Sequence, residues 1–147
     1  MCKLEFQDIL KILPHRHPFI FIDKIIKYKR EKYIIAVKNI KINNFFFKGH
    51  FPGYPIFPGV LILESVLQTA CVLIYKSMKV LCKEKVWYVS NIDYAKFKKK
   101  VFPGDMIVIY VNISNFRNSV VRFFGDVLVN KKLACRTKMS VMYHTKL

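Results

Sequence analysis

The chain has 147 residues, of which 53% are apolar, including 13 Phe and 8 Tyr, and its formal net charge is +17. This length is typical of one domain, and we expect a single domain over residues 1–147. Its apolar share exceeds what such a core needs and points to a ligand tunnel or a subunit interface. The cysteines are Cys2, Cys71, Cys82 and Cys135. They form no C-x-x-C pair and have no His at ligand spacing, which argues against a zinc site or a disulfide framework. We therefore expect reduced thiols in a cytoplasmic protein.

The first third of the chain predicts a short helix and a pair of strands. Residues Glu5–Leu13 carry apolar side chains at helical spacing and stop at Pro14. Two strands are expected over Phe19–Tyr28 and Tyr33–Ile40, joined by a charged turn. The following segment, Gly49–Gly59, is so rich in proline and glycine that neither helix nor strand can accommodate it. We therefore expect a loop of fixed shape there.

The rest of the chain predicts one enclosed helix followed by strands. From Gly59 to about Met78 the pattern is apolar nearly all round, which indicates a buried helix. The stretch Ile56–Tyr75 is almost long enough to span a bilayer, but Glu64 near its middle favours a soluble helix. Short links separate the β-rich runs, which are Val86–Ser90, Met106–Ile113, Ser119–Val129 and Leu133–Tyr143. An α+β fold with an antiparallel sheet wrapped around one helix is expected.

His50 is the first candidate catalytic residue. It lies among the prolines and glycines of the 49–59 loop, which leave it little conformational freedom. A base that must meet one particular proton needs such a position. The alternative is a loop histidine that only bonds a neighbouring carbonyl group.

Glu64 is the second candidate. It lies five residues into the apolar helix, where burial of an unpaired carboxylate raises its pKa and lets the protonated group act as an acid. The alternative is a buried Glu paired with a Lys or Arg. Gln68 falls one turn later on the same face and can orient Glu64 or a water. At the helix N-terminus, the backbone N–H of Gly59 is a ready stabiliser of a thioester oxyanion.

Three segments of the chain match the motifs of one known family. Leu13-Pro14-His15-Arg16-His17-Pro18-Phe19 with Asp23 is similar to the family's L-P-H-R-x-P-F…D motif. The run from Gly49 to Glu64 is similar to G-H-F-P-G-x-P-x-x-P-G-V-L-x-x-E. Phe97 with Val101 and Pro103-Gly104-Asp105 resembles F-x-x-x-V-x-P-G-D. The three motifs occur in the family's order and cover essentially the whole chain, which thus resembles the FabZ-type β-hydroxyacyl-acyl-carrier-protein dehydratases.

The resemblance implies a hot-dog fold and a (3R)-hydroxyacyl-carrier-protein dehydratase of type II fatty acid elongation, without cofactor or metal. It assigns His50 as the base that takes the α-proton and Glu64 as the acid that protonates the departing hydroxyl. Gly59 is implied to donate its N–H to the thioester carbonyl, and the Ile56 carbonyl to orient the His50 ring. The two catalytic residues are implied to come from different subunits of a dimer, and a hexamer built as a trimer of dimers is the implied assembly.

The chain departs from the family pattern in three places. His17 stands where Tyr is more frequent, Asn44-Phe45 replaces a frequent Glu-Pro, and Lys100 replaces a frequent Pro. None of these changes the acid–base pair. Because the related dehydratase-isomerases carry Asp at the acid position, Glu64 favours dehydration alone.

Two other functions are weighed against dehydration: thioester hydrolysis on the same fold, and a non-catalytic acyl-binding or nucleic-acid-binding module.

The high positive charge has three interpretations: a generally solvated basic surface, an acidic protein partner, or nucleic acid. An abundance of Lys, Ile, Asn, Phe and Tyr is the bias that an AT-rich genome produces, and it accounts for part of the charge. We expect the acidic acyl carrier protein as the partner rather than nucleic acid. Its expected docking site is a cluster between two predicted strands, Lys96, Lys98, Lys99 and Lys100.

Overall fold

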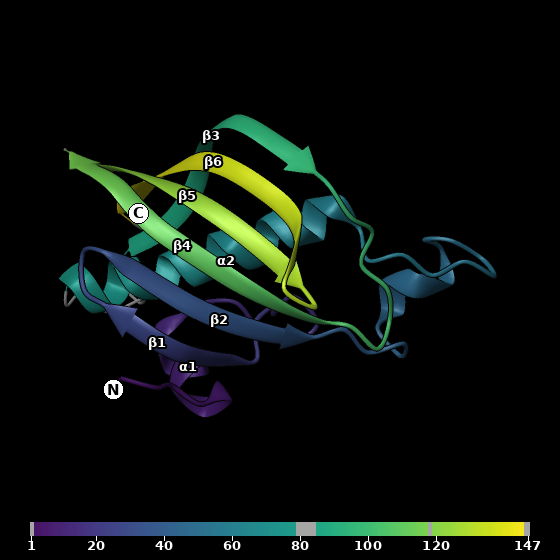
Figure 1. Cartoon of the computed structure of the whole chain (residues 1–147). Helices are drawn as coiled ribbons and strands as arrows, with labels where there is room; N and C mark the ends of the chain where they lie inside the picture. The colour runs from purple at the N-terminus through teal and green to yellow at the C-terminus, as the bar shows by residue number, and fades with distance from the viewer. Residues whose placement is uncertain (1, 79–84, 118, 146–147) are drawn as a thin grey trace.

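The computed structural model describes residues 2–78, 85–117 and 119–145, in which one long helix lies against a single curved sheet (Figure 1). Cys82 lies outside the described residues. Three helical and six extended elements follow one another along this part of the chain: α1 (Phe6–Ile12), β1 (Lys24–Lys29), β2 (Tyr33–Asn39), the 3₁₀ helix η1 (Phe45–Lys48), α2 (Gly59–Met78), β3 (Lys85–Phe97), β4 (Met106–Arg117), β5 (Val120–Val129) and β6 (Lys132–Thr145).

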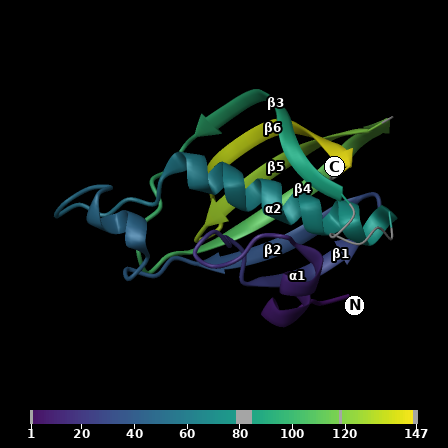
Figure 2. The ribbon, with the colours of Figure 1, turned by 180° about the vertical axis from the view of Figure 1, so that it is seen from behind.

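The six strands form one antiparallel sheet in the order β1-β2-β4-β5-β6-β3. Strand β3 therefore lies at the sheet edge opposite β1. Seen from behind, α2 runs along the inner face of the curved sheet (Figure 2). The expected α+β arrangement, with an antiparallel sheet around a central helix, is present.

Helix α2 supplies most of the core contact with the sheet. Every residue from Ser65 to Tyr75 is buried. At Gly125 of β5 the helix approaches closely, since an added Cβ there would lie 2.4 Å from Val66 Cγ1. By length and composition alone α2 could cross a bilayer, and 67% of its apolar window is buried inside the chain. Its all-round apolar pattern matches this enclosed position.

The segment between α1 and β1 was predicted to be a strand from Phe19 onward, and this is wrong for its first part, because β1 begins only at Lys24. The backbone N–H of Phe21 donates to the side chain of Gln68 instead of to a neighbouring strand. Phe21 and Ile22 are both buried. The segment therefore packs on α2 and carries the first motif to the middle of the fold.

Strand β3 is longer than the predicted Val86–Ser90 and runs to Phe97. Irregular pairing with β6 between Val89 and Asn91, and again between Ile92 and Tyr94, disrupts the alternation from which a strand is recognised. Lys96 consequently lies on this strand rather than between two strands, and only Lys98, Lys99 and Lys100 follow it.

Candidate active site

The 49–58 loop fixes both the position and the ring orientation of His50. The backbone N–H of His50 donates to the carbonyl of Phe46 at 3.0 Å, and that of Ile56 donates to the carbonyl of His50 at 3.0 Å. His50 Nδ1 lies 2.8 Å from the Ile56 carbonyl oxygen, the contact that the resemblance implies. Because a carbonyl oxygen only accepts, Nδ1 carries the hydrogen and Nε2 of the neutral ring keeps its lone pair. His50 therefore presents Nε2 as a base.

The loop beyond His50 is closed on itself. Phe51 and Tyr54 exchange two backbone hydrogen bonds of 2.9 Å around a turn in which Gly53 has φ +73°. A side chain at Gly53 would strain this left-handed backbone. At the end of the loop, the Phe57 N–H donates to the Val101 carbonyl at 2.8 Å and ties the loop to the segment after β3.

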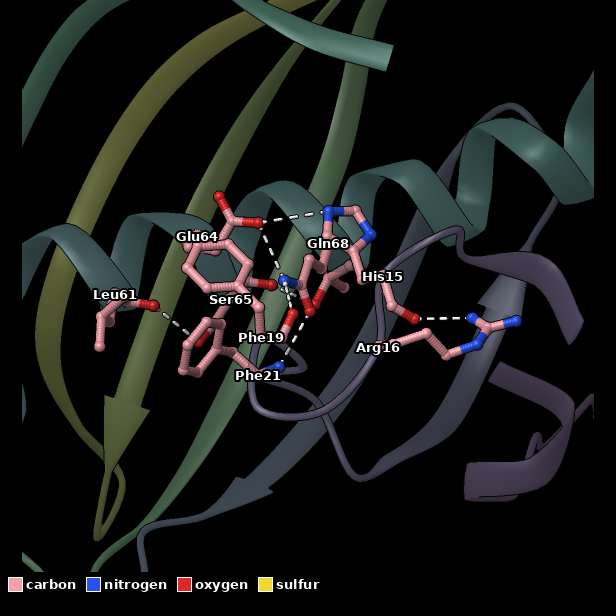
Figure 3. A network of polar contacts seen from close by, with 9 residues as sticks. His15, Arg16, Phe19, Phe21, Leu61, Glu64, Ser65 and Gln68 are labelled. Carbon is pink, nitrogen blue, oxygen red and sulfur yellow. Dashed lines mark hydrogen bonds and ion pairs between the residues drawn. The ribbon is translucent and has the colours of Figure 1, made fainter. Parts of the chain in front are cut away.

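Glu64 lies on the second turn of α2, and its side chain is only 17% exposed. Gln68, which is fully buried, donates from Nε2 to Glu64 Oε1 at 2.9 Å (Figure 3). The contact predicted from the spacing of these two residues is therefore present. The sequence predicts an unpaired carboxylate at this position, but in the structure the carboxylate has hydrogen-bond donors beside it.

The second neighbour of Glu64 is His15, to which sequence reasoning assigned no role. His15 Nε2 lies 3.5 Å from Glu64 Oε1 (Figure 3). The two residues are far apart along the chain, and their contact depends on how residues 13–23 pack on α2. The sequence feature that could have pointed to a role for His15 is its position inside the first motif, Leu13–Phe19.

Gly59 begins α2 beside a cavity of about 410 Å³, whose lining includes Ile56, Phe97 and the three lysines that follow β3. The first N–H groups of a helix have no partner within the helix, so they can bind an anionic oxygen. The ring of Phe97 lies against Gly59, where an added Cβ would be 3.0 Å from Phe97 Cε1. Lys98, Lys99 and Lys100 thus border the cavity that Gly59 and Ile56 line, whereas Lys96 lies over the Tyr94 ring.

The structure brings the predicted residues together in two groups. His50 contacts Ile56, and Glu64 contacts Gln68, but in the described part of the chain no hydrogen bond or ion pair joins His50 to Glu64. The segment between β2 and α2, which carries His50, projects beyond the end of the sheet (Figures 1 and 2). Among the residues described, no group of three or more His, Cys, Asp or Glu side chains is arranged for a metal ion. The two groups together offer a base and a carboxyl group for proton transfer.

Solved structures show the same fold. The dehydratase heterocomplex ApeI:P from Xenorhabdus doucetiae aligns with a TM-score of 0.79 at 12% identity, over 94% of this chain and 91% of that one. Smu.793 from Streptococcus mutans, solved with acetyl CoA, aligns with a TM-score of 0.67 at 11% identity, over 91% and 97% of the two chains. At such low identities the likeness shows the fold alone. It is the hot-dog fold that the family resemblance implies.

Sequence comparison identifies the family. The model of the FabA-like domain matches residues 13–138. The 3-hydroxyacyl-[acyl-carrier-protein] dehydratase FabZ of Blochmanniella floridana is 44% identical over 138 residues, covering 94% of this chain and 91% of the relative. FabZ of Escherichia coli strain K12 / DH10B is 42% identical over 136 residues, covering 92% and 90%. The chain therefore belongs to the FabZ family of FabA-like domain proteins.

Proposed function

We propose that the chain is a hydro-lyase that converts a (3R)-hydroxyacyl thioester of the acyl carrier protein into the trans-2-enoyl thioester and water, in type II fatty acid elongation. Family membership supports the reaction class. The observation that carries the assignment of roles is the hydrogen bond between His50 Nδ1 and the Ile56 carbonyl, which leaves Nε2 free to accept a proton.

In the proposed mechanism, His50 Nε2 removes the proton from the α-carbon of the substrate. The electron pair of that C–H bond forms the double bond between the α- and β-carbons, while the bond from the β-carbon to its hydroxyl breaks. Glu64 delivers its proton to the departing hydroxyl, which leaves as water. The Gly59 N–H stabilises the negative charge that develops on the thioester oxygen. The substrate is neither oxidised nor reduced overall, so the proposed reaction needs no redox cofactor.

We infer that the working unit is at least a homodimer, with His50 and Glu64 of one site supplied by two subunits. Two observations support this. The loop with His50 projects away from the sheet (Figure 1), and no hydrogen bond or ion pair joins His50 to Glu64 within the described chain. Strand β3 is also an edge strand, and among its described residues it exposes four large apolar side chains alongside polar ones, namely Tyr88, Val89, Ile92 and Phe97. Such an edge is suited to pairing with a second copy. A trimer of dimers is the further assembly that we propose.

The acyl carrier protein is the proposed source of substrate, and no nucleic acid is involved. Lys98, Lys99 and Lys100 border the cavity beside Gly59, so a negatively charged carrier docked on them would bring its thioester to the helix N-terminus. Such attraction mainly raises the association rate. We also propose that the chain is cytoplasmic and that α2 is a core helix rather than a membrane span, since two thirds of its apolar window is buried.

The reverse reaction provides the test. Hydration of crotonyl thioester removes the conjugated double bond, so a dehydratase lowers the ultraviolet absorbance of this substrate. The proposal predicts this loss without release of free thiol. Release of thiol would indicate a thioesterase, and binding of the acyl chain without turnover would indicate a non-catalytic module; either result would overturn the proposal.

A further inference from the structure

Gln68 and His15 both contact the same oxygen of the Glu64 carboxyl group. Gln68 Nε2 lies 2.9 Å and His15 Nε2 lies 3.5 Å from Oε1. In the described part of the chain, Oε2 has no hydrogen bond or ion pair, and it points away from both neighbours (Figure 3). The two oxygens of one carboxyl group are therefore in different surroundings.

The amide of Gln68 has only one orientation that satisfies its surroundings. Its Oε1 accepts the Phe21 N–H at 2.9 Å, so its NH₂ end faces the Phe19 carbonyl at 3.1 Å and Glu64 at 2.9 Å. Reversal of the amide would leave the Phe21 N–H unpaired and turn an oxygen toward the carbonyl of Phe19. Because Gln68 is fully buried, water cannot compensate for this loss. Gln68 can therefore only donate to Glu64.

The burial of His15 Nδ1 determines which nitrogen of the ring carries the hydrogen. His15 Nδ1 is inaccessible to solvent and has no hydrogen-bond partner in the described structure. A hydrogen on Nδ1, whether in the charged ring or in one of the neutral forms, would be a buried donor without an acceptor. The neutral form with its hydrogen on Nε2 avoids this and points the N–H at Glu64 Oε1. His15 is thus a second donor to the same oxygen.

The backbone around His15 holds the ring in this position. The Arg16 guanidinium donates from Nη1 to the carbonyls of Leu13 at 2.8 Å and His15 at 2.6 Å. The ring of His15 stacks on that of Phe19, with centroids 6.5 Å apart and planes inclined by 15°. Hydrogen bonds in an unliganded site are often long and shorten when substrate binds. The distance of 3.5 Å is consistent with such a contact.

We propose that His15 is a positioning residue that acts with Gln68 to make Oε2 of Glu64 the oxygen that carries and transfers the proton. A proton on Oε1 would point at two N–H donors, whereas a proton on Oε2 meets neither of them. When Glu64 has given up its proton, both donors stabilise the charge that remains on the carboxylate. This inference rests on the proposed role of Glu64 as the acid of the dehydration.

The first test compares two amides at position 15. The amide nitrogen of Gln can take the place of His15 Nε2, but that of the shorter Asn corresponds to Nδ1 and does not reach Oε1. We expect His15→Gln to keep most of the kcat, and His15→Asn to lower it about tenfold with little change in KM, because a hydrogen bond to a charged group is lost. The exposed His17 supplies the matched control, and His17→Asn should leave kcat unchanged.

The second test asks whether His15 acts through Glu64. In a Glu64→Gln background, whose residual activity is measured with excess enzyme, His15→Asn should cause no further loss. A full additional tenfold loss would show that His15 acts elsewhere and would overturn the inference. Equal activities of the Gln and Asn variants, whether high or low, would also overturn it. Near wild-type activity of Glu64→Gln alone would instead reject the proposed function.

A measurement on the unmodified protein remains decisive if a variant does not fold. The ¹⁵N chemical shifts of the His15 ring distinguish a protonated from an unprotonated nitrogen. The inference predicts a protonated Nε2 and an unprotonated Nδ1 at neutral pH. A hydrogen on Nδ1 would overturn it.

Discussion

His50 Nδ1 and the carbonyl oxygen of Ile56 are 2.8 Å apart, so one loop both carries the histidine and sets which ring nitrogen is free. The two residues lie six positions apart in a stretch of chain rich in proline and glycine. The base of the proposed reaction is therefore oriented before substrate arrives. Its partner, Glu64, is held by a different segment of the chain, through Gln68 and His15.

Gln68 is predicted to support both stability and turnover. Gln68→Met keeps the size of the side chain but leaves the buried N–H of Phe21 without a partner. We expect the free energy of unfolding to fall by about 1–3 kcal/mol, and kcat to fall because Glu64 loses a donor. Urea denaturation and the hydration assay measure the two effects. Gln7→Met, at an exposed position of α1, is the matched control and should change neither.

Gly125 is predicted to be required for the contact between β5 and α2. An added Cβ would lie 2.4 Å from Val66 Cγ1 and 3.2 Å from Thr137 Cγ2, so Gly125→Ala should destabilise the protein by about 1–3 kcal/mol. Gly49→Ala is the control for stability, since nothing lies within 4 Å of its added Cβ. Combining Gly125→Ala with Val66→Ala should cost less than the sum of the two single changes. Strict additivity would mean that the two residues do not compete for this space.

The buried thiols are predicted to be unreactive in the folded protein. Burial, together with the negative charge of Glu64, raises the pKa of the Cys71 thiol from 9.0 to about 12. Burial and Asp126 raise that of Cys135 to about 11. At pH 8, iodoacetamide should modify the exposed Cys2 quickly and these two only after unfolding, as mass spectrometry of peptides can show. Rapid labelling of Cys71 in the folded state would contradict its position.

The raised pKa values of the Cys71 and Cys135 thiols predict that the protein loses stability in alkali. Because the folded-state pKa values lie above 9.0, the unfolded chain loses these thiol protons first as the pH rises. The stabilisation is therefore complete below pH 9.0 and declines as the pH approaches the folded-state values. Unfolding free energies at pH 8 and pH 10 should differ less in a Cys71→Ala and Cys135→Ala double variant than in the wild type. An unchanged difference would assign the decline to other groups.

The lysines beside the cavity are predicted to attract the carrier protein. Lys98→Glu with Lys99→Glu should raise the KM for a carrier-bound substrate about tenfold at low salt, and spare a short uncharged thioester. The same charge change at Lys29 and Lys32, which are exposed at the β1–β2 turn, is the control and should have no such effect. Equal losses with both substrates would mean that Lys98 and Lys99 support the fold. No loss with either would place the docking surface elsewhere.

The sequence predicted the parts of the site that are close together along the chain. Gln68 was paired with Glu64 because a spacing of four residues is one helical turn, and the bounds of α2 followed from its unbroken apolar pattern. His15 was missed because no local rule connects it to Glu64, and the contact exists only after residues 13–23 pack on α2. The start of β1 and the end of β3 were misplaced for a similar reason. Phe21 satisfies its backbone with a side chain, and irregular pairing conceals the alternation of β3.

We propose that His50 and Glu64 form the acid–base pair of one site shared between two subunits. His50→Ala and Glu64→Gln should each lower dehydration at least ~100-fold while the circular dichroism spectrum stays normal. When equal amounts of the two variants are refolded together, activity should return to about a quarter of the wild-type value, because half of the dimers are mixed and each of these has one intact site. Near wild-type turnover of either single variant would contradict the acid–base pair. Absence of recovery in dimers that native mass spectrometry identifies as mixed would contradict the shared site.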